Sequence, residues 1–194
     1  AGVKTRPRKG KLGLRAADTG MVFLDGVRVP KDRVLGKEGE GFRIALSTLD
    51  TGRISLAAGA VGLMQRALDL SLAYAGERKQ FGKPIAQFQL VQEHLAAMKL
   101  DLAAARLLTY RAAWKKVKGE PYTLEASLAK LFASEAANRV AYRAIQVHGG
   151  YGFFEEYEAA RLYRGARILT RYEGTSEVQK LVLGAHLTGV RAFA

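Results

Sequence analysis

The spacing of its prolines constrains this chain more than any other sequence feature. Only four prolines occur in 194 residues, and they leave long stretches without a residue that would break a helix. One such stretch extends from about residue 40 to residue 78. Within it, apolar side chains recur at the spacing of one helix face, at Val61, Met64, Leu68 and Leu72. We therefore expect a first long helix over this stretch.

Two more long helices are predicted after Pro84 and Pro121. The second carries an apolar stripe of Val91, Leu95, Met98, Leu102 and Ala105. The third carries a stripe of Leu124, Leu128, Leu131 and Phe132 and ends at the glycines of residues 149–152. A shorter helix is expected over residues 157–169, and a last one after Gly174, where Ser176–Gln179 has the spacing of a capping box. Long helices with short connections pack as an antiparallel bundle.

The first 35 residues have a different pattern. Two short apolar runs, Met21–Leu24 and Val27–Val29, flank the turn pair Asp25–Gly26, which predicts a β-hairpin. A sheet this small buries no useful core, so we expect it to be part of something larger. The predicted fold class is mainly α, a four- or five-helix antiparallel bundle over residues 36–194, preceded by a short β remnant and linker over residues 1–35.

Charge and cysteine content exclude several function classes. Lysine and arginine number 31 against 18 acidic residues, a formal charge of +13. Six of these cations lie in residues 1–16 without any acid. Such an arm could bind nucleic acid or an anionic membrane, but it has no aromatic side chain for base stacking, and a solvated terminus or linker is the favoured interpretation. The absence of cysteine excludes disulfides, cysteine-ligated metals and a thiol nucleophile.

Neither a membrane segment nor a metal site is expected. The longest apolar stretch, Ile54–Met64, is far shorter than the roughly 20 residues that span a bilayer. Residues 1–16 hold no apolar core of a signal peptide, so a cytoplasmic location is predicted. His94, His148 and His186 are too dispersed to form a metal motif.

What remains are three junctions between predicted helices. They are Glu77–Pro84 (ERKQFGKP), Gln146–Gly152 (QVHGGYG) and Tyr172–Glu177 (YEGTSE). Free backbone N–H groups at a helix start, with nearby cations and glycines, suit a phosphate-containing ligand. Taken singly, each junction is equally explained as a helix cap or a turn.

Together, the three junctions resemble the C-terminal signatures of the acyl-CoA dehydrogenase family, in order and at the expected separations. The upstream run Leu12–Thr19 and the pair Val29–Pro30 resemble the end of that family's middle β-domain. The resemblance covers nearly all of this chain but only the second half of a typical member. It implies FAD-dependent oxidation of an acyl-CoA thioester to the trans-2-enoyl-CoA, as part of a longer enzyme.

The resemblance also assigns roles to residues. Glu173 matches the base that removes the α-proton, and Gly52 stands where some members place the base instead. Asp50, Arg53 and Gly174 match substrate-binding positions. The implied cofactor-binding residues are Arg78, Gln80, Phe81, Gln89, Gln146, Gly149, Gly150, Thr175 and Glu177, those of the first two junctions reaching the FAD of a neighbouring subunit. Glu177 replaces a common glutamine, and a carboxylate beside a pyrophosphate is unfavourable.

The implied partners follow from the same family. They are an acyl-CoA substrate, an electron-transfer flavoprotein or similar acceptor, and further copies of the chain in a homotetramer built as a dimer of dimers. In a eukaryotic source the implied compartment is the mitochondrial matrix. Two other hypotheses stay open: a helical assembly module without activity of its own, and a nucleic-acid-binding bundle suggested only by the charge.

Overall fold

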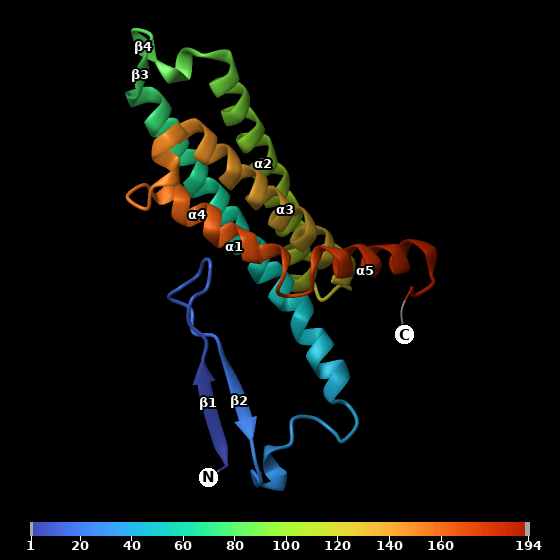
Figure 1. Cartoon of the computed structure of the whole chain (residues 1–194). Helices are drawn as coiled ribbons and strands as arrows, with labels where there is room; N and C mark the ends of the chain where they lie inside the picture. Colours follow the sequence, from blue (N-terminus) through green and yellow to red (C-terminus); the bar gives the residue numbers. More distant parts are fainter. Residues whose placement is uncertain (1, 193–194) are drawn as a thin grey trace.

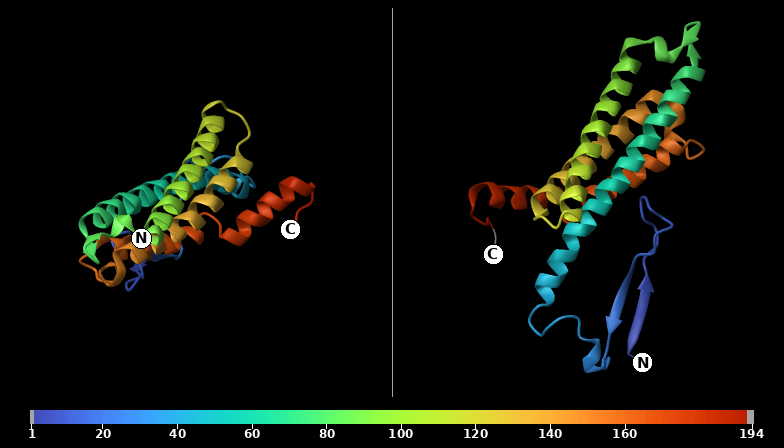
Figure 2. Two further views of the ribbon diagram at one scale, coloured as in Figure 1. Left: turned by 90° about the horizontal axis from the view of Figure 1, so that it is seen from above. Right: turned by 180° about the vertical axis from the view of Figure 1, so that it is seen from behind.

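A computed structural model describes residues 2–192 and shows a mainly helical molecule (Figure 1). The helices are α1 (Gly41–Glu77), α2 (Gln89–Val117), α3 (Thr123–His148), α4 (Glu158–Ala166) and α5 (Ser176–Thr188). The first three run alongside one another as a bundle, and α4 packs on α3 and α1 (Figures 1 and 2). The predicted fold class, a helical bundle preceded by a short β segment, is confirmed.

The β segment exists, but its predicted pairing is wrong. Strand β2 (Gly20–Leu24) pairs antiparallel with β1 (Val3–Pro7), and Val27–Val29 forms no strand. Gly26 does make a turn, at φ +58°, yet the chain then leads away into a 3-10 turn at Lys31–Arg33. Every residue of β1 and β2 is exposed, so this sheet buries no core, as its size predicts.

Most helix boundaries follow the breakers in the sequence. Helix α1 agrees within one residue at each end with the predicted stretch. Helix α2 begins five residues after Pro84, because Lys83–Pro84 (β4) pairs with Lys79–Gln80 (β3) in a tight hairpin. Its two turn residues, Phe81 and Gly82, have φ of +52° and +77°, as a two-residue hairpin turn requires.

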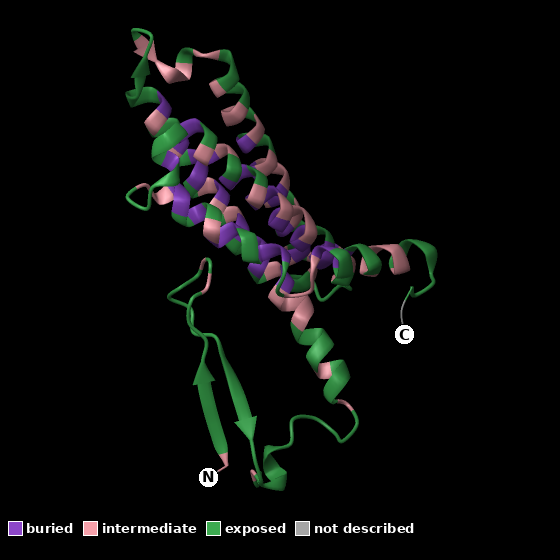
Figure 3. Ribbon diagram, viewed as in Figure 1, coloured by how far each residue is buried: buried purple, intermediate pink, exposed green. Residues whose placement is uncertain are grey.

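The bundle core combines long apolar side chains with many alanines. Met64, Leu68, Met98, Leu102 and Ala105 are buried as predicted. Of the stripe predicted on α3, Phe132 packs against the core but Leu128 is 37% exposed, and Leu72 of the stripe predicted on α1 is 50% exposed. The buried face of α3 is instead formed by Ala126, Ala129, Ala133, Ala136, Ala137, Val140 and Ala144. Alanines permit close approach of the neighbouring helices, and Figure 3 shows the burial concentrated there.

Helix α5 leaves the bundle sideways (Figures 1 and 2). Its N-cap is Thr175, whose Oγ1 accepts a hydrogen bond from the backbone N–H of Val178 at 3.3 Å. The N-cap therefore lies one residue before Ser176, and the predicted capping box is wrong, because the residue that faces the cap is Val178, which has no polar side chain. The Ser176 hydroxyl donates to Glu135 instead. Only Ser176 and Gln179 of α5 are buried. Across residues 2–192, no helix combines the length and apolar character needed to cross a bilayer.

Candidate active site

The loop between α4 and α5 carries Glu173 in an unusual backbone conformation. Glu173 has φ +59°, a left-handed value that is uncommon outside glycine, and Gly174 follows at φ +88°. Two consecutive carbonyl groups of this loop are held from the bundle side. The Glu173 carbonyl accepts from Gln179 Nε2 at 3.0 Å and from Arg53 Nε at 3.3 Å. The Gly174 carbonyl accepts from Lys130 Nζ at 2.6 Å and from Gln179 Nε2 at 3.3 Å.

The Glu173 carboxylate lies in space that Gly52 leaves free. A Cβ atom at position 52 would stand 2.3 Å from Glu173 Oε2 and 2.9 Å from Oε1. Within the described chain, Oε2 is buried and has no hydrogen-bond partner. A dry carboxylate oxygen with a free lone pair is suited to accept a proton from a ligand placed beside it.

Arg53 and Asp50 lie next to this carboxylate and are already engaged with one another. Arg53 is 6% exposed, and its Nη1 donates to Asp50 Oδ1 at 2.8 Å and to Ser127 Oγ at 3.4 Å. The other Asp50 oxygen accepts from Thr123 Oγ1 at 2.6 Å. The structure thus brings Asp50, Arg53, Glu173 and Gly174 together and gives the two charged substrate candidates structural partners.

Lys130 completes this cluster. Its side chain is fully buried in α3, and burial together with the Arg53 charge lowers its pKa from 10.5 to about 8. Sequence reasoning missed Lys130, Ser127 and Gln179. The available signal was a lysine within the alanine face of the third helix, one turn after Ala126 and one turn before Ala133.

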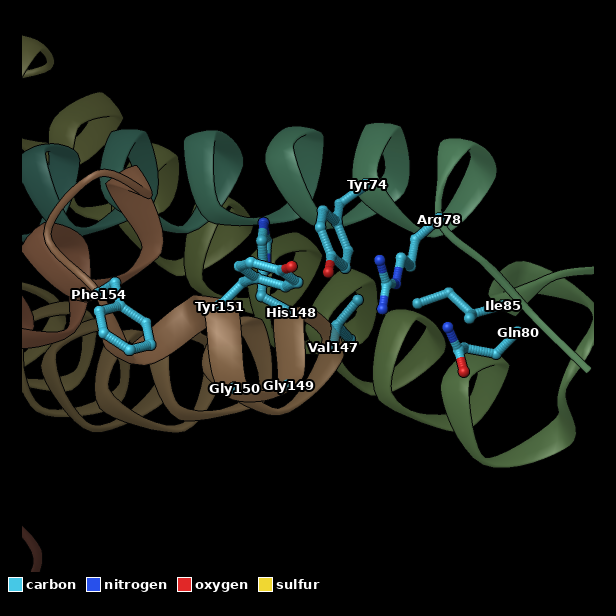
Figure 4. A pocket seen from close by; sticks show the side chains of 10 residues that line it. All are labelled: Tyr74, Arg78, Gln80, Ile85, Val147, His148, Gly149, Gly150, Tyr151 and Phe154. Atoms are coloured by element: carbon cyan, nitrogen blue, oxygen red, sulfur yellow. The ribbon is translucent and has the colours of Figure 1, made fainter.

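A second group of predicted residues lies at the other end of α1. Arg78, Gln80, Gly149 and Gly150 line a pocket of about 420 Å³. Figure 4 shows Arg78 reaching from the end of α1 toward Val147 near the end of α3, with Tyr151 in the 3-10 turn Gly149–Phe153 that follows α3. The remaining lining residues are Tyr74, Ile85, His148 and Phe154. At 1.5 Å per residue, about 37 Å of helix separates Arg53 from Arg78, so the two groups form separate sites on this chain.

The walls of this pocket are aromatic and basic. The Arg78 guanidinium lies 5.4 Å from the centre of the Tyr151 ring, and the Tyr74 and His148 rings stack at 4.5 Å. Burial lowers the pKa of His148, and its Nδ1 lies 2.7 Å from the Ala144 carbonyl oxygen. The pocket therefore offers one exposed cation, aromatic faces and a glycine backbone.

The remaining cofactor candidates do not line this pocket. Phe81 is 91% exposed at the hairpin tip and packs edge-on against Phe88. Gln89 and Gln146 are exposed. Glu177 lines a smaller, polar hollow of about 250 Å³ beside α5, and hydrogen bonds from its own backbone N–H and from Thr175 lower its pKa. Nowhere in residues 2–192 do three His, Cys, Asp or Glu side chains gather as a metal site needs.

Fold and site together define a helical bundle with a loop at one end that holds the partly buried Glu173 carboxylate, and a basic, glycine-edged pocket at the other. Comparison with known proteins agrees with this class. The family model for the acyl-CoA dehydrogenase C-terminal domain matches residues 39–188. The chain belongs to the acyl-CoA dehydrogenase family.

Three relatives illustrate the match. The mitochondrial short-chain specific acyl-CoA dehydrogenase of Bos taurus is 48% identical over 96% of this chain and 45% of its own length. The structure of butyryl-CoA dehydrogenase from Megasphaera elsdenii superposes with a TM-score of 0.94 at 45% identity, over 96% of this chain and 49% of that one. An acyl-CoA dehydrogenase complexed with FAD from Bacillus anthracis gives 0.91 at 37% identity, over 96% and 36%. The chain thus spans about half the length, or less, of these relatives.

Proposed function

We propose that the protein containing this chain oxidises an acyl-CoA thioester to the trans-2-enoyl-CoA, with Glu173 as the base. The observation that carries the proposal is the Glu173 carboxylate, which lies against Gly52 with a buried oxygen that has no partner in the described chain. An α-proton beside a thioester carbonyl is only weakly acidic, so its removal needs a base held close and away from water. Glu173 accepts that proton, and Gly174 beside it is the proposed substrate contact. The missing side chain of Gly174 leaves room for the Gln179 amide, whose Nε2 would lie 2.5 Å from a Cβ there.

The residues at the Arg78 end fit a cofactor that contains phosphate. A guanidinium cation, the Gln80 amide and the open backbone at Gly149 and Gly150 face one pocket, and this donor set suits a pyrophosphate. We propose that these residues, with Phe81, Gln89 and Gln146 near them, hold part of an FAD bound mainly by a neighbouring subunit. Thr175 and Glu177 would hold the nucleotide at the other end of the chain. FAD, when bound, supplies the acceptor for the β-hydride.

Surface chemistry supports two further parts of the proposal. Helix α2 exposes apolar side chains along one face, at Leu100, Leu107, Tyr110, Trp114 and Val117. Such a face favours self-association, and we propose the dimer of dimers that the family resemblance implies.

Apolar strand residues Val22, Phe23 and Leu24 are 64%, 44% and 70% exposed, which supports a division into residues 1–35 of a β-domain and a helical domain over residues 36–194.

We also propose that an electron-transfer flavoprotein or similar acceptor reoxidises the cofactor. The proposed compartment is the cytoplasm, or the mitochondrial matrix in a eukaryotic source. The basic residues of positions 2–16 lie in β1 and the loop after it, and the proposal needs no nucleic-acid partner.

Substitution of Glu173 in the native protein tests the proposed base. Glu173→Gln keeps the side chain's size and removes its basicity, so we expect anaerobic flavin reduction by butanoyl-CoA to slow by about 10²–10⁴-fold. Glu120→Gln, in the exposed turn between α2 and α3, is the matched control and should leave the rate unchanged. A Glu173→Gln protein that reduces flavin at the wild-type rate would overturn the assignment. Native protein that binds no flavin would instead favour the assembly module.

A further inference from the structure

Lys130 is a buried charge that packing alone does not explain. Its side chain has 0% exposure within the alanine face of α3. In the part of the chain that the structure describes, no carboxylate lies within ion-pair distance of its Nζ, and its hydrogen bond goes to the Gly174 carbonyl at 2.6 Å. Burying an ammonium group without a paired carboxylate is costly, whereas methionine would fill similar space without that cost.

The bond that Lys130 makes acts on the backbone of the loop that carries Glu173. Lys130 and Gln179 both donate to the Gly174 carbonyl, and Gln179 also donates to the Glu173 carbonyl. Gln179 is itself fully buried. Donors aimed at two successive carbonyls fix the orientation of both peptide planes. They thereby stabilise the left-handed backbone of Glu173, which a glutamate otherwise adopts at a cost.

The orientation of that backbone decides where the carboxylate lies. With Glu173 at φ +59°, its side chain enters the space beside Gly52. A relaxed loop would turn the Cα–Cβ bond elsewhere and move the carboxylate away from its position. The requirement for a base is geometric, since an error of about 1 Å costs roughly 10²-fold in rate.

We propose that Lys130 and Gln179 are positioning residues for Glu173, holding the Glu173–Gly174 backbone so that the carboxylate faces the substrate's α-carbon. The inference rests on the proposed function, because it takes Glu173 as the base. Neither side chain is assigned a contact with the substrate. Their effect passes through the two carbonyl groups and the backbone of the loop.

The test isolates the base step in the native, cofactor-loaded protein. A thioester without β-hydrogens, 3,3-dimethylbutanoyl-CoA, cannot lose hydride, yet its α-protons can exchange with D₂O through the base. We expect Lys130→Met and Gln179→Met to slow this exchange, followed by NMR, by about 10²-fold at saturating thioester, with half-saturation unchanged. Amide hydrogen exchange of residues 171–178, measured without ligand, should accelerate in both variants.

A matched control separates positioning from general destabilisation. Met98→Ala removes a fully buried side chain from α2, which forms no part of the Glu173 cluster. It should lower the melting temperature while exchange at the α-carbon and loop protection stay at wild-type values. Wild-type α-proton exchange in Lys130→Met, with slow exchange in Glu173→Gln, overturns this inference alone. If Lys130→Met does not fold, the same result in Gln179→Met overturns it. Wild-type exchange in Glu173→Gln overturns the proposed base and this inference together.

Discussion

Arg53 within α1 and Arg78 at its C-terminal cap show how differently the two ends of the bundle are built. Arg53 is 6% exposed, and Asp50, Ser127 and the Glu173 carbonyl accept its N–H groups. Arg78, at the other end of α1, is exposed. Among residues 2–192 its guanidinium has no ion-pair partner and lies only against the Tyr151 ring. One arginine is committed to its own chain, and the other keeps its donors for a ligand.

The difference teaches which parts of the proposed site this chain completes by itself. Around Glu173, buried donors from Arg53, Lys130 and Gln179 are paired with the loop carbonyls, so the loop has its position before any ligand binds, while the carboxylate oxygen Oε2 has no partner among the described residues. Around Arg78, the pocket walls are set by the helix ends, but the charge is not neutralised there. The first end is preorganised, and under the proposed function an anionic cofactor and a second subunit would complete the second.

The largest effect that would sharpen this contrast is on stability. Arg53→Met leaves the partly buried Asp50 without its cation, and the Glu173 carbonyl and Ser127 each lose a donor, so we expect the free energy of unfolding to fall by about 3 kcal/mol. Arg78→Met, the matched change at the Arg78 pocket, should alter the free energy of unfolding by less than about 0.5 kcal/mol. Urea unfolding of both variants in the native protein measures this difference. Equal stability losses would contradict the contrast between the two ends.

The pH dependence of stability tests the buried charge of Lys130, which lies at the Glu173 end of the bundle. Lys130 faces Arg53 on α1, Glu135 on its own helix, Glu173 in the loop and Glu177 on α5. Its pKa falls from 10.5 when unfolded to about 8 in the folded protein. Between these values the unfolded state binds more protons, so stability rises with pH across this window.

Below about pH 8 the buried charge of Lys130 lowers the free energy of unfolding by its full amount, and above about pH 10.5 this loss is gone. The difference in the free energy of unfolding is about 3 kcal/mol. Other lysines titrate equally in wild type and Lys130→Met, so the comparison isolates this group. We expect the unfolding free energy of the wild type to rise relative to the variant from pH 8 to 10.5. Parallel curves would show that Lys130 pays no such cost.

The sequence predicted the long helices well because their signals are local. The proline-free stretch with helical apolar spacing, from about residue 40 to residue 78, places α1 within one residue. The strand that pairs with β2 was mispredicted. The turn pair Asp25–Gly26 indicates a hairpin with the residues that follow it, but the pairing strand β1 precedes β2 in the chain. The α3 core was mispredicted because leucines dominate an apolar pattern while alanines do the packing. For the same reason Lys130 was not recognised as a buried residue, because it lies among the alanines and not in the predicted leucine stripe.

The site was predicted unevenly for a related reason. The position of Glu173 came from family resemblance, since no spacing rule marks a lone acid before a helix as a base. Whether such an acid is buried depends on the residue across the bundle, and Gly52 lies 121 positions earlier in the chain. Arg53 and Asp50 were expected to contact substrate. Their bond to each other is a local i,i+3 pair on α1, but the bonds from Arg53 to Ser127 and to the Glu173 carbonyl are tertiary and leave no local pattern.

A substitution at Gly52 is the smallest change that should displace the Glu173 carboxylate while leaving the fold intact. In Gly52→Ala the new Cβ would stand 2.3 Å from Glu173 Oε2, so the carboxylate must move. We expect flavin reduction to slow by about 10²-fold, or about 2.7 kcal/mol of barrier. Alanine is the better helix former, so stability should stay level or rise by up to about 1 kcal/mol. Gly59→Ala on the same helix, where a Cβ meets nothing within 4 Å, should gain the same helix propensity at an unchanged rate. A wild-type rate in Gly52→Ala would mean that the carboxylate's place beside Gly52 is not the position from which it reacts.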